Sequence, residues 1–276
     1  MNHYSSSTVV AAAAKDDRCS EEESTNNKDA LFRILCLHGK GGNGEEFLER
    51  LHPLRRVVDE RLMDNKHSNI TIKWDALTAP YQMGDNDDDA YAWWTMKPGE
   101  RSYNAQEYIG FDESASKVLK SVFPNSDQSS CCNYDLILGH SQGAILLSAL
   151  LATNVDLQRS KCSYVLNGAA YPNPYKNALT SLPQQQSQHD NMQDVPMLFV
   201  MGRNDNINPI ESAKQVHDAY KHAGLDVSII YHDGGHSVPT GTDGDSKRAL
   251  DDICDFILRV AARKVEDVAR VASPNV

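Results

Sequence analysis

A serine between two glycines stands near the middle of the chain, in the segment Gly139-His140-Ser141-Gln142-Gly143. A mostly apolar run, residues 134–139, leads into this serine, and a second apolar run, residues 142–153, follows it. A buried strand, a sharp turn and a helix form the setting in which G-x-S-x-G presents a nucleophilic serine, although the five letters alone also occur by chance in loops. A serine hydroxyl becomes a useful nucleophile when a neighbouring base takes its proton. The pattern therefore predicts that Ser141 is a nucleophile.

The base is expected among the histidines that follow Ser141. When G-x-S-x-G presents a nucleophile on such a turn, an acid and then a histidine follow it along the chain. His232 ends the last apolar run, residues 227–232, and His236 lies four residues later, after two glycines that allow a close turn. A base belongs on the loop after the last strand, at the edge of the sheet where the serine lies. We therefore predict that His236 is the base, with His232 as the alternative.

The acid is expected just after the preceding strand. Asp205 follows the apolar run of residues 197–202. Its carboxylate would accept a hydrogen bond from one imidazole nitrogen of His236 and leave the other nitrogen free to take the serine proton. Asp233 is too close in sequence to His236 to orient it. The alternative is that Asp205 only caps a helix that begins near Pro209.

A glycine-rich loop, residues 38–44, follows the first apolar run of the chain. One backbone N–H of such a loop, together with the N–H of the residue after the nucleophile, can stabilise the negative oxygen of the transition state. These donors would be Lys40, or Gly41, and Gln142. The loop also spells G-x-G-x-x-G, but a dinucleotide-binding site needs an acidic residue at the end of the next strand, about 20 residues on. At that distance stands Asp64, around the end of a predicted helix, so nucleotide binding is the less favoured interpretation.

Short apolar runs alternate with longer helical patterns over most of the chain. The predicted strands cover residues 32–37, 70–76, 134–139, 163–167, 197–202 and 227–232. The predicted helices cover residues 45–63, 112–122, 142–153, 209–223 and 247–271. A repeated strand–helix order predicts an α/β fold in which helices cover both faces of a mostly parallel sheet of about six strands. Residues 81–108, 172–194 and 237–245 fit neither pattern.

The length and composition favour one domain over residues 31–272 after a polar, disordered tail of residues 1–30. The 276 residues include 38 acidic and 27 basic side chains, for a formal net charge of −11, so nucleic acid is not an expected partner. There is no apolar run of about 18 residues, so no membrane span is expected. The spacing of the six cysteines suggests neither a metal site nor a disulfide framework, which favours the cytoplasm.

Six segments between residues 32 and 258 form a specific combination. They read RILCLHGKGGNG, the pair Trp93-Trp94, YIGFDES from Tyr108, YDLILGHSQGA, VPMLFVMGRNDNINP and HDGGHSVP. This combination resembles the FSH family of serine hydrolases. The resemblance implies an α/β-hydrolase fold without a large cap domain, a carboxylesterase or thioesterase activity on acyl esters or thioesters, and no cofactor or metal. It also implies that Ser141, Asp205 and His236 are the catalytic triad.

Two residues depart from what is common in this family. Lys40 stands where many members have a bulky apolar residue, and His140 stands where many have Phe. These departures leave the substrate preference open. Aromatic residues between the second and third strands, namely Trp93, Trp94 and Tyr108, are candidates for an apolar acyl pocket, although ordinary core packing is the alternative for each.

The expected function is hydrolysis of an acyl ester or thioester through an acyl-enzyme intermediate. Two other functions remain open from the sequence. One is a non-catalytic protein that binds a small molecule on the same fold, since a fold does not fix a function. The other is a peptidase on this fold. The oligomeric state cannot be predicted from these residues.

Overall fold

The computed structural model describes residues 30–64, 69–84, 89–124, 132–186 and 195–272. The predicted tail lies outside the described residues, except for Ala30, which begins the first strand. The division into a tail and one domain over residues 31–272 stays a prediction, as does the cytoplasmic location. Within the described ranges, no helix is long and apolar enough to cross a membrane.

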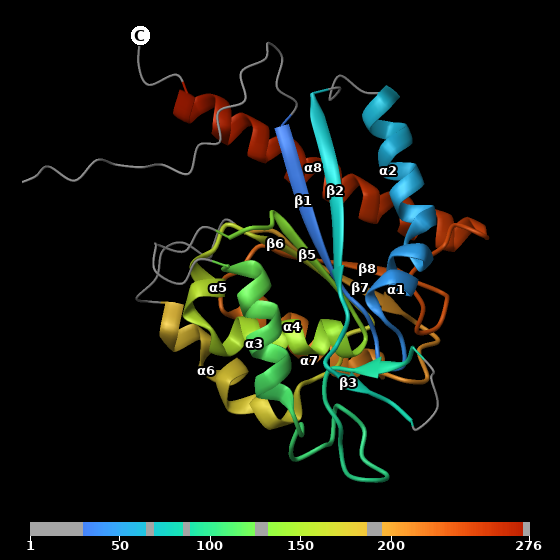
Figure 1. The fold of residues 1–276 in the computed structure, drawn as a ribbon, viewed down its shortest axis with the longest axis vertical. Helices are drawn as coiled ribbons and strands as arrows, with labels where there is room; N and C mark the ends of the chain where they lie inside the picture. Colours follow the sequence, from blue (N-terminus) through green and yellow to red (C-terminus); the bar gives the residue numbers. More distant parts are fainter. Residues whose placement is uncertain (1–29, 65–68, 85–88, 125–131, 187–194, 273–276) are drawn as a thin grey trace, which may run out of the picture.

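A parallel sheet forms the centre of the molecule (Figure 1). In the described part of the chain it has six strands in the order β2-β1-β5-β6-β7-β8, and every neighbouring pair is parallel. The strands are β1 (Ala30–Leu37), β2 (Ile70–Leu77), β5 (Leu136–His140), β6 (Ser163–Asn167), β7 (Met197–Gly202) and β8 (Val227–His232). The four inner strands are apolar runs because both faces of the sheet are covered. The predicted mostly parallel sheet is confirmed.

The register of the sheet brings the ends of distant strands to one edge. Leu37 at the end of β1 is level with Gly139 on β5, and His140 is level with Asn167 at the end of β6. Gly202 at the end of β7 is level with His232 at the end of β8. The loops that follow β1, β5, β7 and β8 therefore start from the same carboxyl edge, where ligands bind in open α/β sheets.

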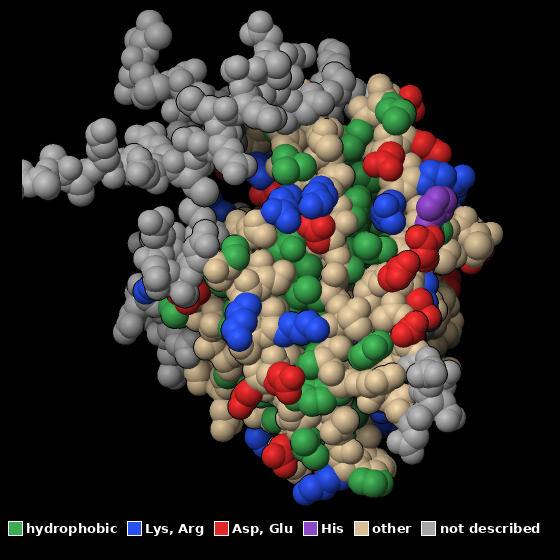
Figure 2. All heavy atoms as spheres, viewed as in Figure 1, with side chains coloured by type: hydrophobic (Ala, Val, Ile, Leu, Met, Phe, Trp, Pro, Cys, Tyr) green, Lys and Arg blue, Asp and Glu red, His purple; other side chains and the backbone are tan. Residues whose placement is uncertain are grey.

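Helices cover both faces of the sheet (Figure 1). Apolar side chains of α1, α2 and α8 pack in one core cluster, and those of α3, α4, α6 and α7 pack in the other. The helices are α1 (Gly44–Arg50), α2 (His52–Asp64), α3 (Phe111–Val122), α4 (Gln142–Thr153), α5 (Val155–Arg159), α6 (Lys176–Gln186), α7 (Ile210–His222) and α8 (Gly244–Ala272). Figure 2 shows acidic and basic side chains interspersed over one face of the molecule. One such ion pair, between Arg61 and Asp251 at 2.7 Å, joins α2 to α8.

The structure differs from the predicted elements in several places. The predicted helix over residues 45–63 is two helices, because Pro53 near the start of α2 has no N–H to continue the hydrogen bonds of α1. The unassigned segments contain short elements that the sequence does not reveal. They are β3 (Tyr81–Gln82) and β4 (Tyr91–Ala92), which pair as a small antiparallel sheet, and a 3₁₀ turn (Asn173–Tyr175) followed by α6. The short helix α5 was not predicted either.

Candidate active site

Ser141 lies in a strained turn between β5 and α4. Its φ of 52° and ψ of −117° make it the one non-glycine residue with positive φ in the described ranges. The crossing of strand and helix needs glycine on both sides of the serine. A Cβ atom on Gly139 would lie 2.7 Å from the backbone of Ala144, and one on Gly143 would lie 2.3 Å from the carbonyl oxygen of Leu37. The packing of α4 on β1 and β5 therefore imposes this turn, which presents the hydroxyl at the carboxyl edge of the sheet.

The loop after β8 carries His236 to the serine. The Nε2 atom of His236 lies 2.7 Å from Oγ of Ser141, and its Nδ1 atom lies 2.7 Å from Oδ2 of Asp205. Glycine allows this approach, since a Cβ atom on Gly202 would lie 2.1 Å from the carbonyl oxygen of Gly235. The structure thus brings the three predicted side chains into one hydrogen-bonded chain. His232, the alternative base, is a buried residue at the end of β8.

Asp205 holds His236 with one oxygen and its own loop with the other. Its Oδ1 atom accepts hydrogen bonds from the N–H groups of Ile207 at 2.8 Å and Asn208 at 2.9 Å. Burial opposes ionisation of this carboxyl, but the hydrogen bonds from His236 and from the two backbone N–H groups outweigh it and hold the pKa below its usual value. The helix-cap alternative is not what the structure shows, because α7 begins at Ile210 and the two bonded N–H groups precede it.

Backbone N–H groups beside Ser141 come from the loop after β1 and from the start of α4. The N–H of Gly41 donates to the carbonyl of Tyr91 at 2.8 Å, so it is not available to a substrate. Among the described residues no acceptor bonds to the N–H of Lys40. The side chain of Gln142 accepts from the N–H of Trp93 at 2.9 Å, which holds the first turn of α4 in place. Of the predicted donors, Lys40 and Gln142 therefore remain suited to a negative oxygen.

His38 fixes the glycine-rich loop, a role that the sequence analysis missed. Its Nε2 atom accepts a hydrogen bond from the N–H of Ala79 at 2.9 Å, so the proton is on Nδ1, which donates to the carbonyl of Gly39 at 2.7 Å. Its own carbonyl accepts from Nε1 of Trp93 at 2.8 Å. Burial lowers the pKa of His38 to about 4, so this imidazole is neutral at pH 7. A histidine at the end of a predicted strand was the available signal.

His140 is a second neutral imidazole beside the serine. Its ring lies 5.1 Å from the ring of His236 and stacks on Phe47 at 5.8 Å between ring centroids. Its Nδ1 atom lies 2.8 Å from Nδ2 of Asn167. Burial, and then the nearby His236, lower the pKa of His140 to about 3.

These two imidazoles make the stability of the fold depend on pH. In the folded protein they bind protons at about pH 4 and about pH 3, whereas their ordinary pKa is 6.5. Between the folded and the ordinary pKa, each imidazole is neutral in the folded protein and protonated in the unfolded chain, so unfolding takes up protons. The free energy of unfolding is therefore expected to fall as pH drops from about 6.5 to about 4. Each imidazole contributes a loss of about 1.4 kcal/mol per pH unit. Urea unfolding at half-unit steps of pH measures this slope. The variant His140→Phe should make the slope shallower by about 1.4 kcal/mol per pH unit, and an equally steep slope in that variant would contradict the assignment.

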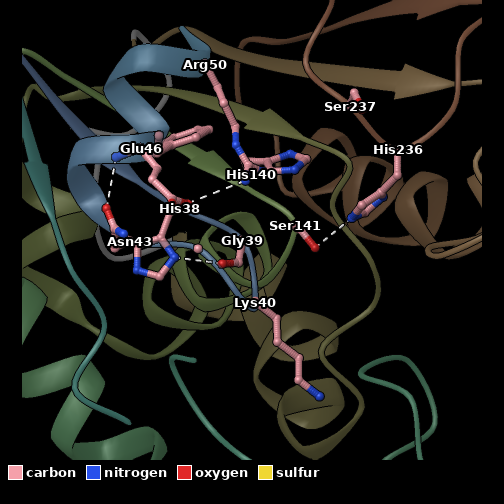
Figure 3. Close-up of a pocket in the computed structure, with 12 residues that line it drawn as sticks. His38, Gly39, Lys40, Asn43, Glu46, Arg50, His140, Ser141, His236 and Ser237 are labelled. Atoms are coloured by element: carbon pink, nitrogen blue, oxygen red, sulfur yellow. Dashed lines mark hydrogen bonds and ion pairs between the residues drawn. The ribbon is translucent and has the colours of Figure 1, made fainter. Parts of the chain in front are cut away.

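A cavity of about 210 Å³ opens beside Ser141 (Figure 3). Its lining includes residues of the β1–α1 loop and of α1, namely Asn43, Glu46, Phe47 and Arg50, together with His140, Ser141 and His236. The sequence analysis did not include the residues of α1. The available signal was that this helix directly follows the glycine-rich loop, so its side chains must lie near that loop.

The predicted aromatic pocket is wrong. Trp93 and Trp94 are fully buried, Tyr108 is 5% exposed, and all three belong to the hydrophobic core. Trp94 stacks on Tyr108 with 4.4 Å between ring centroids, and neither ring lines the cavity. The backbone of this segment nevertheless supports the site. The N–H of Trp93 donates to the side chain of Gln142, and that side chain donates to the carbonyl of Trp94.

A strained serine at the carboxyl edge of a parallel sheet, with an acid and a histidine from later strands, defines the α/β-hydrolase class. The family model described as serine hydrolase (FSH1) matches residues 28–247. The chain therefore belongs to this family of serine hydrolases, as its motifs predicted.

Relatives named as esterases agree with this class, and solved structures share its fold. The chain is 27% identical to Esterase OVCA2 of Danio rerio over 224 residues, which cover 76% of this chain and 91% of that protein. It is 24% identical to Esterase C25G4.2 of Caenorhabditis elegans over 85% of this chain and 96% of that protein. The crystal structure of esterase PE8 matches with a TM-score of 0.57 at 16% identity, covering 84% of this chain and 93% of that one. Acyl-protein thioesterase 2 of Zea mays matches with a TM-score of 0.55 at 20% identity, covering 86% and 97%. At such identities the two structures show the fold alone.

Proposed function

We propose that this serine hydrolase cleaves carboxylic esters or thioesters, with Ser141 as nucleophile, His236 as base and Asp205 as the residue that orients the base. The observation that carries the proposal is the continuous hydrogen bonding from Asp205 through His236 to Ser141, with 2.7 Å at each step, beside an open cavity. The relatives named as esterases, and the thioesterase among the structures of the same fold, support this choice of bond.

The geometry favours a two-step reaction. Oγ of Ser141 attacks the carbonyl carbon while Nε2 of His236 takes its proton, and Asp205 stabilises the imidazolium that forms. The N–H groups of Lys40 and Gln142 bind the negative oxygen, and the loss of one such donor costs about 2.7–4 kcal/mol of transition-state stabilisation. His236 then protonates the leaving alcohol or thiol, and in the second step it activates the water that releases the acid.

Two measurements on the same preparation test this function. An alkyl fluorophosphonate should add once to the protein, and peptide mapping should place the adduct on Ser141. A series of p-nitrophenyl esters from acetate to palmitate, together with acyl thioesters, should show turnover. Absence of both the adduct and turnover would contradict the proposal and favour a binding protein on the same fold.

A further inference from the structure

Two cationic residues, Lys40 and Arg50, line the cavity that holds the nucleophile, and Arg50 is the one whose side chain is directed toward His140 (Figure 3). Arg50, the last residue of α1, lines the same cavity as Ser141 and His236. Figure 3 shows its side chain directed from α1 toward His140, which precedes Ser141. The positive charge of Arg50 acts on the imidazoles that line the cavity. Burial is the main cause that lowers the pKa of His38 and of His140, and the charge of Arg50 lowers both further.

The other charged groups of the cavity leave Arg50 able to bind an anion. Glu46 lies one turn earlier on α1, and its Oε2 atom is 3.6 Å from Nη2 of Arg50, which is longer than a normal hydrogen bond. Both side chains are more than half exposed, and such pairs contribute little because water screens them. The two buried imidazoles are neutral at pH 7. The side chain of Lys40 points away from Arg50 and His140 (Figure 3).

The size and lining of the cavity disfavour a long hydrocarbon chain. Its volume of about 210 Å³ is below the range of about 300–1,000 Å³ of pockets for drug-sized ligands. Phe47 lies on its wall, but the large aromatic side chains that could form a deep apolar pocket are buried in the core instead. A short acyl group with a polar end fits such a cavity better than an alkyl chain.

We propose that the substrates are short acyl esters or thioesters that carry a carboxylate, that is, half-esters of dicarboxylic acids, and that Arg50 binds the free carboxylate while Ser141 attacks the ester carbonyl. This inference rests on the function proposed above and names its substrate class. A guanidinium offers two parallel N–H groups to a carboxylate, which gives direction as well as attraction. Arg50 is therefore a specificity-determining residue.

The test compares two esters that differ in one group. Monoethyl glutarate ends in a carboxylate, and ethyl glutaramate carries a neutral amide of nearly the same shape at that position. Hydrolysis is followed by titration of the released acid at constant pH. The wild type should prefer the charged ester in kcat/KM by about tenfold or more, as expected for hydrogen bonds to a charged group. Arg50→Gln should bring the two kcat/KM values together, and Glu46→Gln, which removes the competing carboxylate, should preserve or increase the preference.

Arg56→Gln is the matched control. Arg56 forms the same kind of pair one helix later, with Glu60 at 3.7 Å, and its side chain is 65% exposed against 67% for Arg50. It does not line the cavity, so its removal should leave the preference unchanged. A wild type that hydrolyses both esters equally, or an Arg50→Gln variant that slows both by the same factor, would overturn the inference. A wild type that hydrolyses neither ester and takes up no fluorophosphonate would contradict the proposed function itself.

Discussion

Replacement of Ser141 by alanine is expected to lower kcat for ester hydrolysis by about 10⁶-fold, and His236→Ala should cost about as much. In the proposed mechanism the two side chains act as one unit, because the proton passes across the 2.7 Å contact between Oγ and Nε2. The measurement is kcat of each variant with a single activated ester, under conditions in which the spontaneous reaction is subtracted.

The double variant Ser141→Ala/His236→Ala provides the control. Because either single change already removes the whole unit, the double variant should be no slower than the single ones, whereas independent contributions would multiply. Thermal unfolding should show that both single variants remain folded. If Ser141→Ala kept even one hundredth of the wild-type kcat, another group would have to be the nucleophile.

The variant Asp205→Asn is expected to lower kcat by about 10⁴-fold while the protein stays folded. The two oxygens of Asp205 have different partners, which explains both results. An asparagine can keep an oxygen where Oδ1 accepts from the N–H groups of Ile207 and Asn208, so the loop is preserved. Its amide nitrogen then faces Nδ1 of His236, and this donor forces the proton of the imidazole onto Nε2. An imidazole protonated at Nε2 cannot take the proton of Ser141.

The comparison for this variant is Asp233→Asn. Asp233 lies three residues before His236, its side chain is 69% exposed, and it pairs with Arg203 at 2.9 Å. Loss of this surface carboxylate should change kcat by no more than about twofold. Equal losses in the two variants, measured side by side, would show that general electrostatics near His236 matters and that the orienting role of Asp205 is wrong.

The sheet and the meeting of Ser141, Asp205 and His236 could be predicted because they depend on local patterns. The predicted strands over residues 163–167, 197–202 and 227–232 coincide with β6, β7 and β8 residue for residue. Each of the three side chains closely follows an apolar run in the chain. Since parallel strands end at one edge of a sheet, their proximity follows from the order of the elements.

The walls of the cavity could not be predicted, because they depend on packing between distant segments. Trp93 and Trp94 stand in a segment without regular periodicity, and an aromatic residue there can face a pocket or the core with the same sequence. The hydrogen bonds between their backbone and the side chain of Gln142 hold this segment in place, and these bonds join residues about 50 positions apart. In the same way, Arg50 reads as an ordinary exposed residue of an amphipathic helix until α1 is placed beside His140.

The order of the strands also determines when activity can arise during synthesis of the protein. Of the strands in the described residues, β1 is made first, yet one of its two neighbours in the sheet is β5, so the sheet cannot close on that side until residues 136–140 have left the ribosome. His236 comes from the loop after β8, the last of the described strands, and α8 follows this loop and covers the face of the sheet on which α1 and α2 also pack. A nascent chain that already contains Ser141 therefore still lacks the histidine proposed as its base. If His236 has that role, the serine gains its reactivity only after β8 and the loop that follows it have folded onto the sheet.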